Sequence, residues 1–249
     1  GRGRVLDGMA NALALRGCMT SIMTRGTIGI AVILLCVPSV TVGQATPEES
    51  GGLPQAIPIF PLQDVTLFPN STQPFHIFEP RYRDMVADAL ESDSIIGMVL
   101  LQPGYEPEYE GQPPVYEMGC AGVIIASEQL PDGRYNIVLR GLMKFRILSE
   151  DLDRSYRLAS VEAVSDGVPT SERSLLPQSR EELEEVFRTA FPNAQLSFSD
   201  MSDAEVIDGL SLVVPIEPTE RQELLEADGP VRRASGLVSL LRQRFRIAP

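Results

Sequence analysis

The sequence is poor in the residue types on which most enzyme active sites depend. Its 249 residues include one histidine, three cysteines and no tryptophan, and Lys144 is the only lysine. A Ser-His-Asp triad would need His76, which lies between Phe75 and Ile77 in a strand-like run, and we interpret it as a structural or surface histidine. So few histidines and cysteines also exclude the usual zinc sites. We therefore predict no catalytic residues, no metal and no cofactor.

The sequence also lacks the features of a nucleotide or nucleic-acid binder. It contains no Gly-x-x-x-x-Gly-Lys-Ser/Thr loop, the motif that cradles nucleotide phosphates. The formal net charge is −13 and the sequence pI is near 4.6, whereas nucleic acid requires a basic surface. The acidic excess mainly keeps the protein soluble. We expect no nucleic-acid partner.

Residues 1–45 are predicted to be a signal peptide with an upstream extension. Arg25 supplies the positive region, residues 28–42 form an uncharged and largely apolar core, and small residues stand at the −3 and −1 positions of a cleavage site after Ala45. We expect an exported protein, periplasmic or secreted. The alternatives are a membrane anchor through an uncleaved signal or a cytoplasmic protein. Cleavage would leave Cys120 as the only cysteine, interpreted as a small buried residue.

After a flexible lead-in at 46–56, residues 57–164 are predicted to be rich in β-structure. The expected strands are 57–62, 65–69, 75–78, 94–101, 116–129, 135–140, 143–147 and 156–164. The first two carry prolines and are predicted to be edge strands, because proline cannot donate to a ladder. Asp132-Gly133 predicts a hairpin turn, and Gly141 is expected to end a strand. Many short strands with turn signals favour a small barrel.

One amphipathic helix interrupts these strands. Pro80 suits the first position of a helix, and the apolar residues that follow recur at i, i+3, i+4, i+7 and i+8; they are Tyr82, Met85, Val86, Ala89 and Leu90. Glu79 and Arg83 have the spacing of an i, i+4 ion pair, with the acid at the positive end of the helix.

The remainder is predicted to be helical. Residues 165–179 are a linker, and 180–246 form a helical subdomain. Ser202 and Glu205 make one capping box before a helix that Pro215 stops, and Thr219 and Gln222 offer a second. The last helix opens at Pro230, and its apolar stripe is Val231, Ala234, Leu237, Val238, Leu241 and Phe245.

Several of these motifs together resemble one family. The strings PIFPL, LFP and HIFEPRYRDMVADAL, then GCAG, DGR and KFRI, and finally VVPIEPTERQELLEADGPVRRASGLVSLL follow the order of the substrate-binding domain of ATP-dependent Lon proteases, which also occurs alone. The resemblance spans roughly residues 57–241. Lys144 stands where the family usually has arginine.

The resemblance implies an α+β fold, a PUA-like twisted β pseudo-barrel followed by a C-terminal helical subdomain. It implies a non-catalytic protein or peptide-binding module that recognises unfolded or degron-bearing polypeptides. One alternative is a scaffold or adaptor for one dedicated envelope partner. Another is an ancillary subunit of an ATP-dependent protease if the signal is not used.

We expect the polypeptide site near the junction of barrel and helices and at the loop 105–116. The predicted binding residues are Phe68, Phe78, Glu79, Arg81, Tyr82, Arg83, Tyr105 and Tyr109.

Overall fold

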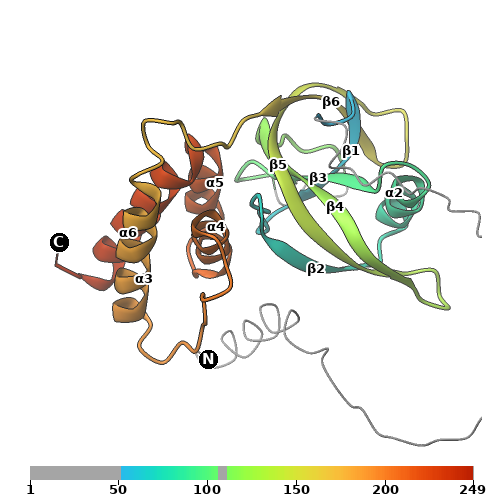
Figure 1. Cartoon of the computed structure of the whole chain (residues 1–249). Helices are drawn as coiled ribbons and strands as arrows, with labels where there is room; N and C mark the ends of the chain where they lie inside the picture. The colour runs from blue at the N-terminus through green and yellow to red at the C-terminus, as the bar shows by residue number, and fades with distance from the viewer. Residues whose placement is uncertain (1–51, 106–110, 249) are drawn as a thin grey trace, which may run out of the picture.

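The computed structural model describes residues 52–105 and 111–248. The predicted signal peptide and most of the lead-in lie outside these ranges. Within them, six strands form one sheet and five helices accompany it (Figure 1). The strands are β1 (Ala56–Leu62), β2 (Thr72–Ile77), β3 (Ile95–Leu100), β4 (Met118–Gln129), β5 (Tyr135–Asp151) and β6 (Arg157–Val164).

The sheet closes on itself, which confirms the predicted pseudo-barrel. The strand order is β2-β5-β4-β3-β1-β6, and β5 also pairs with β6. Strand β5 closes the sheet because it is long enough to pair on both ends: its first half pairs with β2 and β4, and its second half pairs with β6. Gly133, at a φ of +83°, forms the predicted turn between β4 and β5. Only β2 is left as an edge strand in the described sheet.

Strand β1 is not an edge strand, so that prediction was wrong. Residues 59–62 pair with β3 and residues 56–59 pair with β6. The Leu62 carbonyl accepts from the Leu101 N–H, and backbone polar groups alternate between the two sides of a strand. The backbone of Pro58 is therefore directed toward β3, and that of Pro61 toward β6. Pro58 precedes the β3 ladder and Pro61 follows the β6 ladder. Neither proline therefore removes a ladder hydrogen bond.

Residues 65–69 form no strand, which corrects a second prediction. Leu67 and Phe68 are instead completely buried in an irregular segment. The segment runs so close to β5 that a Cβ at Gly141 would lie 2.0 Å from the Phe68 carbonyl oxygen. Gly141 therefore does not end a strand as predicted. It lies inside β5 and leaves room for the backbone that crosses it.

Helix α2 (Pro80–Leu90) follows β2 as expected, with Pro80 in its first turn. Tyr82, Met85, Val86 and Ala89 are buried, whereas Leu90 is exposed and does not belong to the buried stripe. The helix covers part of the barrel beside β1 and β3 on the side away from the C-terminal helices (Figure 1).

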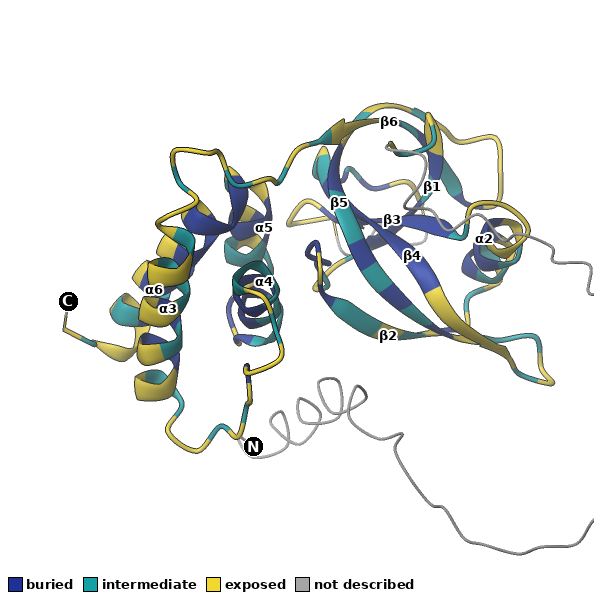
Figure 2. Cartoon of the chain, viewed as in Figure 1, coloured by how far each residue is buried: buried dark blue, intermediate teal, exposed yellow. Residues whose placement is uncertain are grey.

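Alternate residues of the strands belong to two hydrophobic clusters. One cluster contains Ile57, Ile59, Phe145 and neighbours from all five strands of the closed circuit, and it fills the barrel. The other contains the residues that alternate with them along the strands, such as Phe60 and Met98, and it continues into the helices. Burial on both faces explains why β3 is buried at every position, as its continuous apolar run predicts (Figure 2).

Four helices form the C-terminal part: α3 (Leu176–Ala190), α4 (Asp203–Val213), α5 (Pro218–Glu226) and α6 (Gly229–Phe245). Helix α3 begins at Leu176, four residues before the predicted start of the helical subdomain at Arg180. The capping box of Ser202 and Glu205 is confirmed at the start of α4. None of the described helices is long and apolar enough to span a membrane.

Two details of these helices differ from the predictions. The capping box of α5 uses Glu217 and Glu220, because Pro218 fixes the first helical position earlier than a box at Thr219 requires. On α6, the predicted stripe is buried except at Phe245, which is 40% exposed and contacts the ring of Phe191.

Buried charges join the barrel to the helices, and we call Lys144, Asp166, Asp208 and Arg233 the junction cluster. Lys144 projects from β5 and is 2% exposed; its Nζ lies 2.8 Å from Asp166 Oδ1 and donates to the Ala227 carbonyl at 2.7 Å. Arg233 of α6 is completely buried. Its Nη2 donates to both oxygens of Asp166, at 2.8 and 2.9 Å, and its Nη1 donates to Asp208. Two cations and two carboxylates thus form a neutral group.

The segment at 67–71 reaches the same cluster. Asn70 Nδ2 donates to Asp208 Oδ2 at 2.9 Å, and the Arg233 guanidinium lies 5.3 Å from the centroid of the Phe68 ring. Burial raises the pKa of Asp208 to about 6, although Arg233 and Asn70 oppose the shift. The junction of barrel and helices is therefore filled by packed charge.

Candidate functional site

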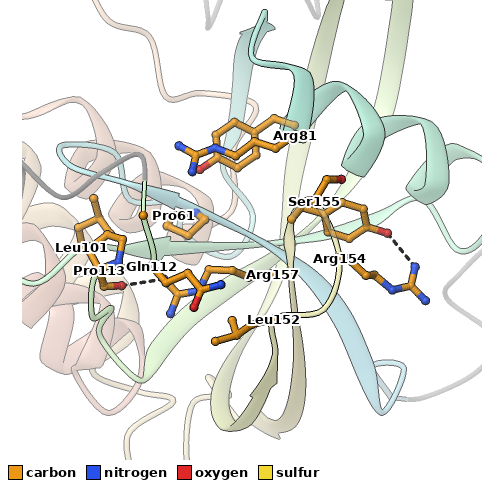
Figure 3. A pocket seen from close by; sticks show the side chains of 12 residues that line it. Pro61, Arg81, Leu101, Gln112, Pro113, Leu152, Arg154, Ser155 and Arg157 are labelled. Carbon is orange, nitrogen blue, oxygen red and sulfur yellow. Dashed lines mark hydrogen bonds between the residues drawn. The ribbon is translucent and has the colours of Figure 1, made fainter.

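A pocket of about 480 Å³ lies on the barrel, where β1 ends, α2 begins and the chain passes from β5 to β6 (Figure 3). Its lining residues are Pro61, Arg81, Tyr82, Leu101, Gly111, Gln112, Pro113, Leu152, Arg154, Ser155, Tyr156 and Arg157. The volume falls within the range of small-molecule pockets. No residue of the C-terminal helices lines it, so it is not at the predicted junction, although part of the predicted loop borders it.

The α2 side of the pocket is built by Arg81 and Tyr82. The Tyr82 ring is buried, and the Arg81 guanidinium lies 4.7 Å from its centroid. Arg81 also donates to Glu79 Oε2 from Nε at 3.0 Å, and its Nη2 lies 2.9 Å from the same oxygen. The partner of Glu79 is thus Arg81 and not the predicted Arg83, whose Nη1 donates to the Asp132 carbonyl on the β4–β5 hairpin.

The segment between β5 and β6 supplies a second wall. Tyr156 is buried, and its hydroxyl donates to Asp88 Oδ2 of α2 at 2.5 Å. Arg154 Nη1 donates to the same hydroxyl at 3.1 Å. Burial and the bond to Asp88 raise the pKa of the Tyr156 phenol. These bonds tie the β5–β6 connection to α2.

Arg157 holds the third side. Its Nε donates to Glu150 Oε2 at 2.5 Å, and its Nη1 donates to the Pro113 carbonyl at 2.7 Å. The side chain is 13% exposed. Because two acceptors on different segments fix the guanidinium, it is held in one orientation beside Gln112 and Pro113 (Figure 3).

The chemistry of the lining favours binding. Over residues 52–105 and 111–248, the lining combines two tyrosines, two leucines and two prolines with three arginines, and it includes no aspartate or glutamate. Among the described residues, no group of three or more His, Cys, Asp or Glu side chains is placed to hold a metal ion. The buried thiol of Cys120 has its pKa raised by desolvation, which disfavours the thiolate. His76 is exposed and its Nδ1 lies 2.8 Å from Asn136 Oδ1.

The structure gathers only some of the predicted binding residues. Arg81 and Tyr82 line the pocket, and Glu79 holds Arg81 from outside. Phe68 is completely buried at the junction, whereas Phe78 is 60% exposed beside His76. Arg83 reaches the hairpin, Tyr105 is 39% exposed, and Tyr109 lies outside the described residues. The predicted set does not form one site.

Several lining residues were missed from the sequence, namely Leu101, Leu152, Arg154, Tyr156 and Arg157. The run 152–157 carries two arginines and a tyrosine within a connection between strands, where exposed polar and aromatic side chains favour binding. That signal was available, but the partners on 61–101 and 111–113 come together only through barrel closure.

Comparisons with known proteins place this chain in a family. The model of the "ATP-dependent protease La (LON) substrate-binding domain" matches residues 56–243. The Lon protease of Cytophaga hutchinsonii is 26% identical over 79% of this chain, and that of Trichlorobacter lovleyi is 26% identical over 78%. The chain covers 26% and 24% of these two proteins, so it spans about a quarter of their length.

Solved structures give the same result. The Lon N-terminal domain protein from Xanthomonas campestris matches with a TM-score of 0.50 and 25% identity, covering 78% of this chain and 99% of that one. The N-terminal domain of the Mycobacterium avium complex Lon protease matches with a TM-score of 0.57 and 16% identity, covering 75% and 97%. These neighbours have the PUA-like fold, which confirms the predicted fold class. The matched region is the substrate-binding domain and does not extend to the protease domain. The chain belongs to the Lon substrate-binding domain family.

Proposed function

We propose that the chain is a polypeptide-binding module that captures unfolded segments, with the pocket between β1, α2 and the β5–β6 connection as its binding site. The observation that carries the proposal is the lining: aromatic and aliphatic side chains stand beside fixed arginines in a concave site of about 480 Å³. Family membership supports the same class of ligand. Recognition of a specific degron would be a refinement of this role.

Apolar side chains of an unfolded segment would enter against Leu101, Leu152 and Pro61. Native proteins keep such side chains buried, so the pocket would distinguish unfolded from folded chains. Leu152 is 40% exposed, and a ligand that covers it removes apolar surface from water.

The test is a comparison of a reduced, unfolded model protein with its native form by fluorescence anisotropy. We expect tighter binding of the unfolded form, and we expect Leu152→Asp to weaken it about tenfold because the substitution places a charge in the contact surface. Leu148→Asp is the matched control, since Leu148 is 60% exposed on β5 and does not line the pocket. Equal binding of native and unfolded forms would refute the proposal.

We propose in addition that the protein is exported, on the strength of the predicted signal before Ala45. The test is the N-terminal sequence and compartment of the natural protein. A mature chain that begins at Thr46 outside the cytoplasm supports export. A chain that retains residues 1–45 in the cytoplasm contradicts it and favours the role of an ancillary subunit of an ATP-dependent protease.

A further inference from the structure

We infer that the pocket recognises a carboxylate on its polypeptide ligand, bound between Arg81 and Arg157 beside an apolar side chain. This inference rests on the proposed function and narrows its ligand class. The carboxylate has two possible sources, the C-terminal end of a polypeptide and the side chain of an internal acidic residue.

The charge of the pocket lining favours an anionic ligand. The protein has a formal net charge of −13, yet the described residues that line the pocket include three arginines and no acidic residue. The carboxylates that pair with these arginines, on Glu79, Asp88 and Glu150, lie outside the lining. An anionic ligand would therefore meet cations first in the pocket, whereas most of the acidic surface repels it.

The orientation of the side chains separates Arg81 and Arg157 from Arg154. Arg81 and Arg157 lie on the same side of the pocket as Gln112, whereas the Arg154 guanidinium points away and contacts the Tyr156 hydroxyl (Figure 3). Nε of Arg157 donates to Glu150 and Nη1 donates to the Pro113 carbonyl, and Nη2 donates to no acceptor among the described residues. A guanidinium has five N–H donors, so Arg157 keeps capacity for a ligand carboxylate.

The low exposure of Arg81 and Arg157 strengthens their interaction with a carboxylate. The side chains of Arg81 and Arg157 are 20% and 13% exposed. Partly buried charges are screened by salt much less than exposed ones, and charge-assisted hydrogen bonds are stronger than neutral ones. Leu101 and Leu152 lie in the same lining, so the site fits a carboxylate that follows or precedes an apolar residue.

The experiment uses the full chain and three short, unstructured, dye-labelled peptides that share one leucine-containing sequence. The first ends in a free carboxylate, the second ends in an amide, and the third ends in an amide but carries one internal glutamate. We expect the free acid to bind about tenfold or more tightly than the plain amide, which corresponds to one charge-assisted interaction. Arg157→Gln and Arg81→Gln should each reduce this difference, and circular dichroism with urea denaturation shows separately that the variants fold. Arg134→Gln, on the β4–β5 hairpin outside the pocket, is the control of equal charge change.

The outcomes separate the two proposals. Tight binding of the acid alone assigns the site to a chain end, and equally tight binding of the glutamate peptide assigns it to acidic side chains; both support a carboxylate site. Equal binding of all three peptides overturns the carboxylate inference and leaves the proposed function standing. A loss of preference in Arg134→Gln as large as in Arg157→Gln also overturns it, because the effect would then be one of overall charge. Failure of every peptide and of the unfolded model protein to bind overturns both proposals.

Discussion

Replacement of Arg233 by methionine tests whether buried charge pairing holds the helices on the barrel. Methionine retains much of the length of arginine but removes its charge and all of its donors. In the folded protein Arg233 is 0% exposed and donates to Asp166, to Asp208 and, at 3.0 Å, to the Leu224 carbonyl. Its removal would leave two carboxylates with Lys144 as the remaining cation of the cluster.

The expected loss is large because the acceptors stay buried. Removal of one partner from a buried ion pair costs about 3 to 5 kcal/mol, whereas the whole free energy of unfolding of a domain is about 5 to 15 kcal/mol. Arg244→Met is the matched control on the same helix. Arg244 pairs with Glu220 and is 37% exposed, and exposed pairs contribute about 1 kcal/mol or less.

Urea denaturation at two pH values measures the effect. Arg233 is the strongest influence that lowers the pKa of Asp208, so its loss raises that pKa further above about 6. The folded variant would keep Asp208 protonated, and this costs more free energy as the pH rises. We therefore expect the destabilisation by Arg233→Met to be greater at pH 8 than at pH 5. A loss no greater than that of Arg244→Met, or a loss that does not depend on pH, would refute the reasoning.

Three further predictions follow from local geometry. The raised pKa of Asp208 stabilises the folded state fully below about pH 4, and this contribution of about 3 kcal/mol is lost as the pH rises through 6. Asp208→Asn should therefore show a smaller decline in the free energy of unfolding between about pH 4 and pH 6. If the free energy of unfolding of the variant and of the unmodified protein fell in parallel with pH, Asp208 would not be the group responsible. Gly141→Ala would place its Cβ 2.0 Å from the Phe68 carbonyl oxygen and should destabilise by about 3 kcal/mol, whereas Gly209→Ala in α4, where the nearest atom is at 3.7 Å, should stabilise by up to about 1 kcal/mol in the same chemical denaturation assay. Ser202→Ala removes the N-cap acceptor of α4 and should cost about 1 kcal/mol, and an unchanged thermal midpoint would show that the cap contributes nothing.

Elements with strong periodic patterns were predictable from the sequence. The stripe of α2, the continuous apolar run of β3 and the capping box of α4 each depend on residues close in sequence. The errors arose where a distant segment decides the local conformation. The Phe68 segment is irregular because it packs across β5 at Gly141, and β1 accommodates its prolines because each neighbouring strand pairs with only half of it.

The candidate site was less predictable than the fold. Arg81 and Tyr82 were identified because they lie in a distinctive string next to Glu79. Arg157 was not, because a β-strand arginine becomes a pocket residue only when barrel closure brings the Pro113 carbonyl to it. Pairing was misjudged for a related reason: helical spacing favours Glu79 with Arg83, but the hairpin of β4 and β5 offers Arg83 another acceptor.

The junction cluster and the arginines of the pocket have different surroundings, and this separates their roles. The junction cluster is covered on both sides, so its charges satisfy one another and none of its four members lines the pocket. Arg81 and Arg157 line the pocket and pair with Glu79 and Glu150, which lie outside it, whereas the Arg154 guanidinium points away from it (Figure 3). Strand β5 is common to both regions, since it carries Lys144 and leads directly into Leu152. Because a fully paired buried cluster resists rearrangement, it fixes β5 relative to the helices, and it thereby helps to hold the pocket wall in place before any ligand arrives.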